Sequence, residues 1–303
     1  MRMSESVRTT ALILTALLLA APAGAAPGRI VSLTPVGTEI LFALGLGDSI
    51  AAVTEFCDTP EEARLKPKIG GFAAFGLESL LAMETDLVVM QDIHAQFAPQ
   101  FEQLGIPYAM LRQSTLAEVL ASIEELGRVC DASAAASEIT GRLRREISRA
   151  AERSTETDDR PRVLICVSRE LSEPRISAFY AAGRGTFYDE LLELAGGVNA
   201  VPPGGSPYPV LSPEGLAKID PDVIIDLVGD RGYYHSMEPV DEDLVFDPER
   251  LKRQWIDSAD TRAAREGRVH VLEGTVFLRP GPEMWRILRA LAAIVHPERE
   301  GSR

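Results

Sequence analysis

Two histidines of this chain follow mainly apolar runs, and imidazole is a common ligand of transition metals. His94 comes after the run at 87–90, and His235 comes after the run at 223–227. Asp92, close to His94, could add a carboxylate ligand. No paired spacing typical of a zinc site accompanies these residues. Binding of a bare metal ion, or an exported metalloenzyme built on these three side chains, therefore stays an alternative.

The sequence contains three cysteines, which are too few and too scattered for a disulfide framework. Cys57 and Asp58 lie in the loop after a predicted strand at 50–53, where their side chains could contact a ligand. Cys166 lies within an apolar run and is expected to be buried as a small hydrophobic residue. Hydrolase, kinase and dinucleotide-binding signatures do not occur in the sequence. The sequence therefore does not indicate any of these three enzyme classes.

Aromatic residues gather in the loops that follow predicted strands, where open parallel sheets bind their ligands. Any one of these rings could simply pack beneath its own loop. Together they could line a broad apolar cleft for a flat or bulky ligand. The aromatic candidates are Phe56, Phe72, Phe75, Tyr180, Tyr208 and Tyr233.

The elements that must position these side chains occur twice in the chain. The stretch 76–90 registers with the stretch 212–226, which places Glu78 on Glu214. Each stretch predicts a short helix, a turn and an apolar strand of the kind found in parallel sheets covered on both faces. The chain is therefore predicted to form two similar α/β lobes with mostly parallel sheets and a ligand cleft between them.

The two matching glutamates each fall in the first turn of a predicted helix. The helix dipole favours a carboxylate there whatever its function. Glu78 and Glu214 also occupy equivalent places on the two lobes. A partner with two-fold symmetry and two arginine clusters would match such a pair. We therefore expect both glutamates to be docking residues.

Helical patterns lie between the two repeats, at 116–129 and 134–153. A helix of 20 residues spans about 30 Å, enough to cross from one lobe to the other. The predicted organisation is an N-terminal lobe at 26–132, a connecting helix at 133–157 and a C-terminal lobe at 158–303. Such a helical connection is expected to be rigid.

The N-terminal 25 residues have the pattern of a secretory signal peptide. Arg2 and Arg8 precede an apolar run at 11–21, and small residues lead to a cleavage site near Ala25. The run is shorter than the ~20 residues that a membrane-spanning helix needs. The mature protein is therefore expected in a bacterial periplasm, without insertion into the membrane.

The chain is acidic, with 45 Asp and Glu residues against 31 Lys and Arg residues and a net charge of -14. Nucleic acids and anionic membranes attract basic surfaces. This charge therefore argues against both as partners and suits a basic protein partner.

From Arg29 to about Val295, the sequence resembles the periplasmic substrate-binding proteins of ABC importers for vitamin B12, ferric siderophores and haem. The motifs that carry the resemblance lie at 29–35, 77–88 and 212–224. The resemblance implies two lobes joined by a long rigid helix, a small-molecule ligand between them, no cofactor and no catalysis. It further implies a monomer whose two matching glutamates dock on a permease dimer that is driven by a cytoplasmic ATPase.

Within this family, the chain is most similar to the members that bind vitamin B12, which implies a corrinoid ligand. Gln91 falls where those members have an aromatic residue, and Gly71 falls where haem-binding members have a tyrosine. A ferric siderophore is the alternative ligand, ahead of haem and free metal. The candidate ligand contacts from all these arguments are Phe56, Cys57, Asp58, Phe72, Phe75, Gln91, His94, Tyr180, Tyr208, Tyr233, His235, Phe277 and Arg279.

Overall fold

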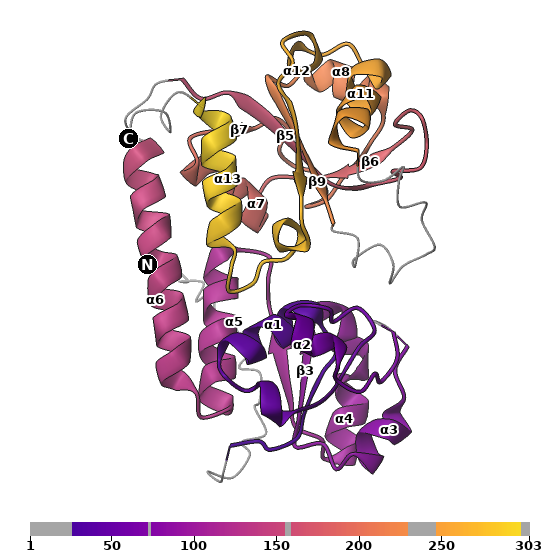
Figure 1. Ribbon diagram of the computed structural model, residues 1–303, viewed down its shortest axis with the longest axis vertical. Helices are drawn as coiled ribbons and strands as arrows, with labels where there is room; N and C mark the ends of the chain where they lie inside the picture. The colour runs from indigo at the N-terminus through magenta and orange to yellow at the C-terminus, as the bar shows by residue number, and fades with distance from the viewer. Residues whose placement is uncertain (1–25, 72–73, 155–158, 230–246, 298–303) are drawn as a thin grey trace, which may run out of the picture.

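The computed structural model describes residues 26–71, 74–154, 159–229 and 247–297. In it, two α/β lobes lie one above the other and are bridged along one side by long helices (Figure 1). The candidate ligand contacts Phe72, Tyr233 and His235 lie outside the described residues, as does the predicted signal peptide. Within the described part of the chain, no helix combines the length and apolar character needed to span a membrane.

The N-terminal lobe is built on a parallel sheet of four strands in the order β2-β1-β3-β4. From β1 the chain continues to β2 on one side of β1, and it then returns to form β3 on the other side of β1. The direction in which strands are added to the sheet therefore reverses between β1 and β3. Ligands of open parallel sheets bind at the carboxyl ends of the strands beside such a switch. The strands are β1 (Ile30–Ser32), β2 (Ile50–Val53), β3 (Leu87–Gln91) and β4 (Tyr108–Leu111).

Short helical elements connect the strands of this sheet. Helix α1 begins at Pro35, because the fixed φ of proline suits the first turn of a helix. The helical elements of the lobe are α1 (Pro35–Ala43), η1 (Gly47–Ser49), α2 (Glu61–Arg64), α3 (Leu77–Ala82), η2 (Asp92–Phe97) and α4 (Ala98–Leu104).

The C-terminal lobe has a mixed sheet in the order β10-β9-β5-β6-β8, with β7 pairing with β5. Strands β5, β7, β9 and β10 are parallel, whereas β6 and β8 are antiparallel additions that the sequence did not predict. Its strands are β5 (Arg162–Arg169), β6 (Phe179–Ala181), β7 (Val198–Asn199), β8 (Val210–Leu211), β9 (Val223–Val228) and β10 (Val269–Glu273). Its helical elements are α7 (Phe187–Leu194), α8 (Pro213–Ile219), α11 (Pro248–Ser258), α12 (Arg262–Arg265), η3 (Thr275–Leu278) and α13 (Trp285–Val295).

The repeat seen in the sequence has a structural basis. Asp86 precedes β3, and its carboxylate accepts a hydrogen bond of 2.8 Å from the backbone N–H of Arg29, next to β1. Asp222 precedes β9, and its carboxylate accepts a bond of 2.8 Å from the backbone N–H of Arg162 in β5. Each aspartate therefore fixes the register of two central strands in its own lobe.

The turn before these two strands has the same backbone conformation in both lobes. Glu84 and Asp220 register with each other, and their φ angles of 48° and 44° are both left-handed. Residues other than glycine rarely adopt this conformation. Its occurrence at matching positions supports the interpretation of two related supersecondary units.

Helices α5 (Leu116–Val129) and α6 (Ser133–Ser154) connect the lobes, and α13 lies alongside them (Figure 1). Helix α5 has the predicted bounds, and α6 extends one residue beyond each predicted end. The Thr115 hydroxyl caps α5 by accepting a bond of 3.2 Å from the backbone N–H of Glu118. Arg142 of α6 stacks on the ring of Trp285 in α13, with its guanidinium carbon 4.9 Å from the ring centre.

One set of buried side chains runs through the connecting helices into both lobes. It includes Val89 of the N-terminal sheet, Leu126 of α5 and Leu143 of α6. It continues to Ile165 of the C-terminal sheet and Leu291 of α13. The lobes are therefore joined by a shared hydrophobic core in addition to the covalent connection.

Candidate functional site

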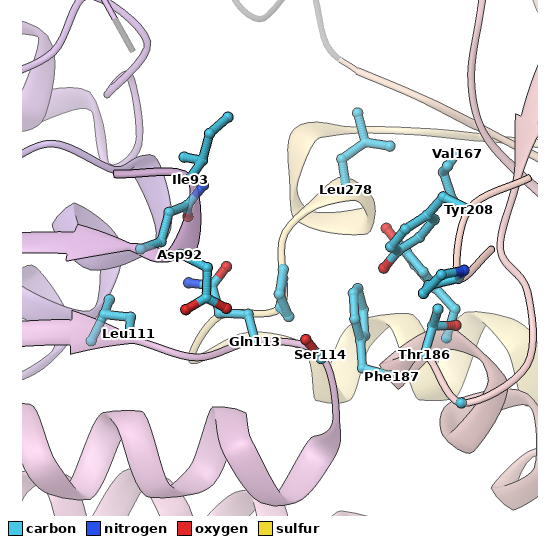
Figure 2. A pocket seen from close by; sticks show the side chains of 15 residues that line it. Asp92, Ile93, Leu111, Gln113, Ser114, Val167, Thr186, Phe187, Tyr208 and Leu278 are labelled. Atoms are coloured by element: carbon cyan, nitrogen blue, oxygen red, sulfur yellow. The ribbon is translucent and has the colours of Figure 1, made fainter. Parts of the chain in front are cut away.

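A cavity of about 440 Å³ lies between the lobes (Figure 2). Asp92, Ile93 and Gln113 lie on one side of it, on the N-terminal lobe. Thr186 and Tyr208 lie on the other side, on the C-terminal lobe. Its N-terminal wall is at the carboxyl ends of β3 and β4, the edge of the sheet where ligands of parallel sheets bind.

Gln91 ends β3 and lines the cavity, and two neighbours hold its side chain. Its amide oxygen accepts a bond of 2.8 Å from the Thr34 hydroxyl. The side chain also accepts a bond from the backbone N–H of His94, and the His94 Nδ1 accepts one of 3.2 Å from the backbone N–H of Gln91. These reciprocal bonds form a capping box at the start of η2. They fix the orientation of Gln91 at the cavity wall.

His94 itself is fully buried inside the N-terminal lobe and is not among the lining residues. The ring of Phe75 lies edge-on to it, with the ring centres 6.4 Å apart. Phe75 also packs against Phe97 at 4.7 Å, within the core of the lobe. The structure therefore places His94 and Phe75 behind the cavity wall, where they support Gln91.

The C-terminal wall begins at the N-terminus of α7. The Thr186 hydroxyl caps this helix and donates a bond of 2.9 Å to the backbone oxygen of Gly183. Tyr188 donates a bond of 2.7 Å from its hydroxyl to the backbone oxygen of Phe277 in η3, which places the adjacent Leu278 at the cavity. Phe277 is half-buried against the shared core and is not among the lining residues.

Tyr208 completes the C-terminal wall from the loop between β7 and β8. Its side chain remains 37% exposed, so it can be reached from solvent. Burial of the phenol group raises the pKa of Tyr208 to about 12, so the hydroxyl is neutral at physiological pH. Tyr208 therefore offers an aromatic face and a neutral hydrogen-bonding group to a ligand.

Arg279 lies between the lobes in an ion triad with Glu39 and Asp58, and its side chain is 7% exposed. Its Nη1 lies 2.8 Å from a Glu39 carboxylate oxygen and 2.9 Å from one of Asp58. Its Nη2 donates a longer bond of 3.4 Å to the backbone oxygen of Phe56. The predicted ligand contacts Asp58 and Arg279 are thus paired with each other and not placed in the cavity wall, because a buried guanidinium requires carboxylate partners.

Two members of the triad, Glu39 and Arg279, have shifted pKa values. Burial raises the pKa of Glu39, and the charge of Arg279 only partly offsets this effect. Burial acts to lower the pKa of Arg279, but the carboxylates of Glu39 and Asp58 raise it above its usual value. The guanidinium is therefore charged at all physiological pH values, and it ties α1 and the loop after β2 to the end of η3.

The remaining predicted ligand contacts that the structure describes are not among the residues that line the cavity. Cys57 is fully buried, and its sulfur lies 3.2 Å from the Thr54 hydroxyl. Burial raises the pKa of the Cys57 thiol, which keeps it protonated. Phe56 is half-buried next to the ion triad. Tyr180 is 49% exposed on β6.

Glu78 and Glu214 are both exposed, in the first turns of α3 and α8. A hydrogen bond from the Ser212 side chain lowers the pKa of Glu214, so it is ionised at neutral pH. Helix α3 lies at the outer end of the N-terminal lobe and α8 at the outer end of the C-terminal lobe (Figure 1). The two carboxylates are therefore presented at opposite ends of the molecule.

The cavity wall is nearly neutral. Among the described residues that line it, Asp92 is the one charged side chain. No group of three His, Cys, Asp or Glu side chains suited to a metal ion occurs in the described part of the chain. Of the predicted ligand contacts, Gln91 and Tyr208 line the cavity, whereas the sequence missed Gln113 and Thr186. Their places after β4 and at the start of α7 are the signals that could have identified them.

The sequence of this chain is similar to those of known binding proteins. The sequence profile of a periplasmic binding protein family matches residues 30–275. The vitamin B12-binding protein of Vibrio campbellii is 30% identical over 198 residues, which cover 65% of this chain and 69% of the relative. The uncharacterized ABC transporter substrate-binding lipoprotein YvrC of Bacillus subtilis is 25% identical, over 90% of this chain and 81% of the relative.

Solved structures share the fold across nearly the whole chain. The periplasmic haem-binding protein RhuT of Roseiflexus sp. RS-1 superposes with a TM-score of 0.71 at 25% identity, covering 90% of this chain and 99% of that protein. The periplasmic vitamin B12-binding protein BtuF of Vibrio cholerae also has a TM-score of 0.71, at 21% identity, covering 91% and 100%. With its two lobes, bridging helices and inter-lobe cavity, this chain belongs to the periplasmic binding protein family.

Proposed function

We propose that this protein captures a corrinoid between its lobes and delivers it to the permease of an ABC importer. Proteins of this family act as transport receptors and not as enzymes. The observation that carries the proposal is the inter-lobe cavity, which combines apolar side chains with neutral hydrogen-bonding groups. Relatives named as vitamin B12-binding proteins support a corrinoid as the cargo.

The charge of the cavity wall favours a cargo without net negative charge and without free carboxylates. Haem carries two carboxylates, and proteins recognise such groups with Arg or Lys. The described lining residues include no basic side chain, and Asp92 would repel a carboxylate. Cobalamin has no free carboxylate, and its corrin ring carries several carboxamide groups. Ferric hydroxamates are also uncharged, so they are the second candidate cargo.

Cobalamin is larger than the cavity, so part of it would extend toward solvent. Ile93 of the N-terminal wall is 54% exposed, and Tyr208 of the opposite wall is 37% exposed. Both can contact the apolar part of a ligand that projects from the cavity. The site is therefore suited to hold one edge of a bulky molecule.

We propose that the mature protein acts in the periplasm after cleavage near Ala25. The first cysteine of the chain is Cys57, so the segment after this predicted cleavage site has no cysteine for lipid attachment. The protein would then diffuse between its cargo and the permease. Its exposed Glu78 and Glu214 would dock on basic residues of the two permease subunits.

Isothermal titration calorimetry of the chain from Ala26 onward tests the proposed cargo. Cyanocobalamin is expected to bind in a one-to-one complex with micromolar or tighter affinity. A ferric hydroxamate and haemin are titrated in parallel. Heat with a ferric hydroxamate but none with cyanocobalamin would overturn the corrinoid proposal and keep the importer class.

Tyr208→Ala is expected to weaken cyanocobalamin binding by about 1 to 3 kcal/mol, because it removes one aromatic face of the site. Calorimetry measures the change in dissociation constant. The comparison variant is Tyr180→Ala, whose ring is exposed on β6 outside the cavity lining. Equal losses for both variants would show that the ligand also covers β6, and no loss for Tyr208→Ala would contradict its role in the site.

A further inference from the structure

The N-terminal wall of the cavity contains a hydrogen-bond donor without a partner. The side-chain nitrogen of Gln113 is buried and makes no hydrogen bond to any described residue. Gln113 lines the cavity two residues after the end of β4. A buried donor that lacks an acceptor is unfavourable. A ligand oxygen at this position would satisfy it.

Gln91 presents a second donor to the same wall. The backbone N–H of His94 donates a hydrogen bond to the side chain of Gln91. Only the oxygen of an amide group can accept such a bond, so the atom that faces His94 is the side-chain oxygen of Gln91. The Thr34 hydroxyl donates to the same oxygen at 2.8 Å. Both bonds use the oxygen, so the amide nitrogen of Gln91 remains for a ligand. Gln91 and Leu111 are register partners on β3 and β4, so both amides extend from adjacent strand ends.

An acceptor lies next to these donors. Asp92 follows Gln91 directly, lines the cavity and is exposed. Figure 2 shows Asp92 and Gln113 together on the N-terminal side of the cavity. The wall thus combines two amide N–H₂ groups with one carboxylate.

We propose that this wall recognises a carboxamide group of the ligand. The carbonyl oxygen of the carboxamide accepts hydrogen bonds from Gln113 and Gln91, and its N–H₂ group donates to Asp92. This inference rests on the proposed function and deepens it, because carboxamides are the polar groups at the edge of a corrin ring. Thr34 and His94 are positioning residues, since they act on the ligand only through the orientation of Gln91.

The same arrangement disfavours a carboxylate in place of the carboxamide. A carboxylate could accept from the two glutamines, but it has no proton to donate to Asp92. It would also place two negative charges side by side in a partly enclosed site. The wall therefore selects carboxamides over the corresponding acids, which differ from them in a single polar group.

Competing titrations test this selection. The chain from Ala26 onward is titrated with cyanocobalamin and with its monocarboxylic acids, each of which has one peripheral carboxamide hydrolysed. At least one acid is expected to bind roughly tenfold or more weakly than cyanocobalamin, the scale of one unpaired buried polar group. Asp92→Asn is expected to reduce this preference, because an amide at this position can bind either group.

Gln113→Leu and Gln113→Glu are expected to lower cyanocobalamin affinity roughly tenfold or more, since both remove the donor. Gln103→Leu, an exposed glutamine on α4, is the matched control and should leave the affinity unchanged. Thermal unfolding confirms that each variant is folded. If cyanocobalamin and all its acids bind equally, or if both Gln113 variants bind normally, the carboxamide wall is wrong while the corrinoid proposal stands. If neither cyanocobalamin nor any acid binds, both fail.

Discussion

Arg279→Met is expected to lower the free energy of unfolding by about 3 to 5 kcal/mol, the cost of removing one partner from a buried ion pair. The change leaves the carboxylates of Glu39 and Asp58 close together between the lobes, with side-chain exposures of only 12% and 10%. Two such charges repel each other and lack solvation. Urea unfolding followed by circular dichroism measures the loss.

Glu39→Gln is the control for this prediction, because it keeps the pair of Arg279 and Asp58. Burial raises the pKa of Glu39, so its charged form is disfavoured in the folded protein and a neutral amide should cost much less. A raised folded-state pKa also means that native Glu39 contributes stability when protonated and loses this contribution as the pH rises through that pKa. Glu39→Gln should remove this dependence. Equal stability of Arg279→Met and the native protein would show that the triad contributes nothing.

The double variant Glu78→Arg with Glu214→Arg is expected to abolish transport while leaving ligand affinity unchanged. The two carboxylates are exposed on α3 and α8, away from the residues that line the cavity. Reversing both charges would place like charges against a basic permease surface at two positions. Uptake of labelled cobalamin by vesicles that contain the permease and its ATPase measures the effect, and calorimetry measures ligand affinity.

A matched control reverses the same amount of charge elsewhere. Glu62→Arg with Glu138→Arg changes two exposed glutamates on α2 and α6. This variant should transport normally, because its sites lie on other elements. Loss of ligand binding in the folded docking variant, or equal loss of transport in the control, would refute the docking role.

Much of the fold could be predicted because its signals are local. The bounds of α5 at 116–129 follow from its apolar periodicity and from the cap at Thr115. The repeat predicted two related lobes, and Asp86 and Asp222 make the same strand contacts in each. Strands β6 and β8 were missed because they have only three and two residues, too few to show alternation.

The site was less predictable because it depends on contacts between distant segments. Arg279 has the chemistry of a ligand contact, but it meets Asp58 across 221 positions of the chain, which no local pattern reveals. His94 has the chemistry of a metal ligand, but it is buried behind Gln91. Gln113 has no motif of its own. Its place in the wall follows only from the pairing of β4 with β3.

The shared core through α5, α6 and α13 has a consequence for the history of the two lobes. If the two lobes descend from one duplicated unit, the two copies now share part of their hydrophobic core. Leu126 and Leu143 now pack in one cluster with side chains from both sheets. Either lobe expressed alone would leave the apolar faces of these helices uncovered. We therefore expect the two halves to unfold as a single cooperative unit, and either half alone to be poorly soluble.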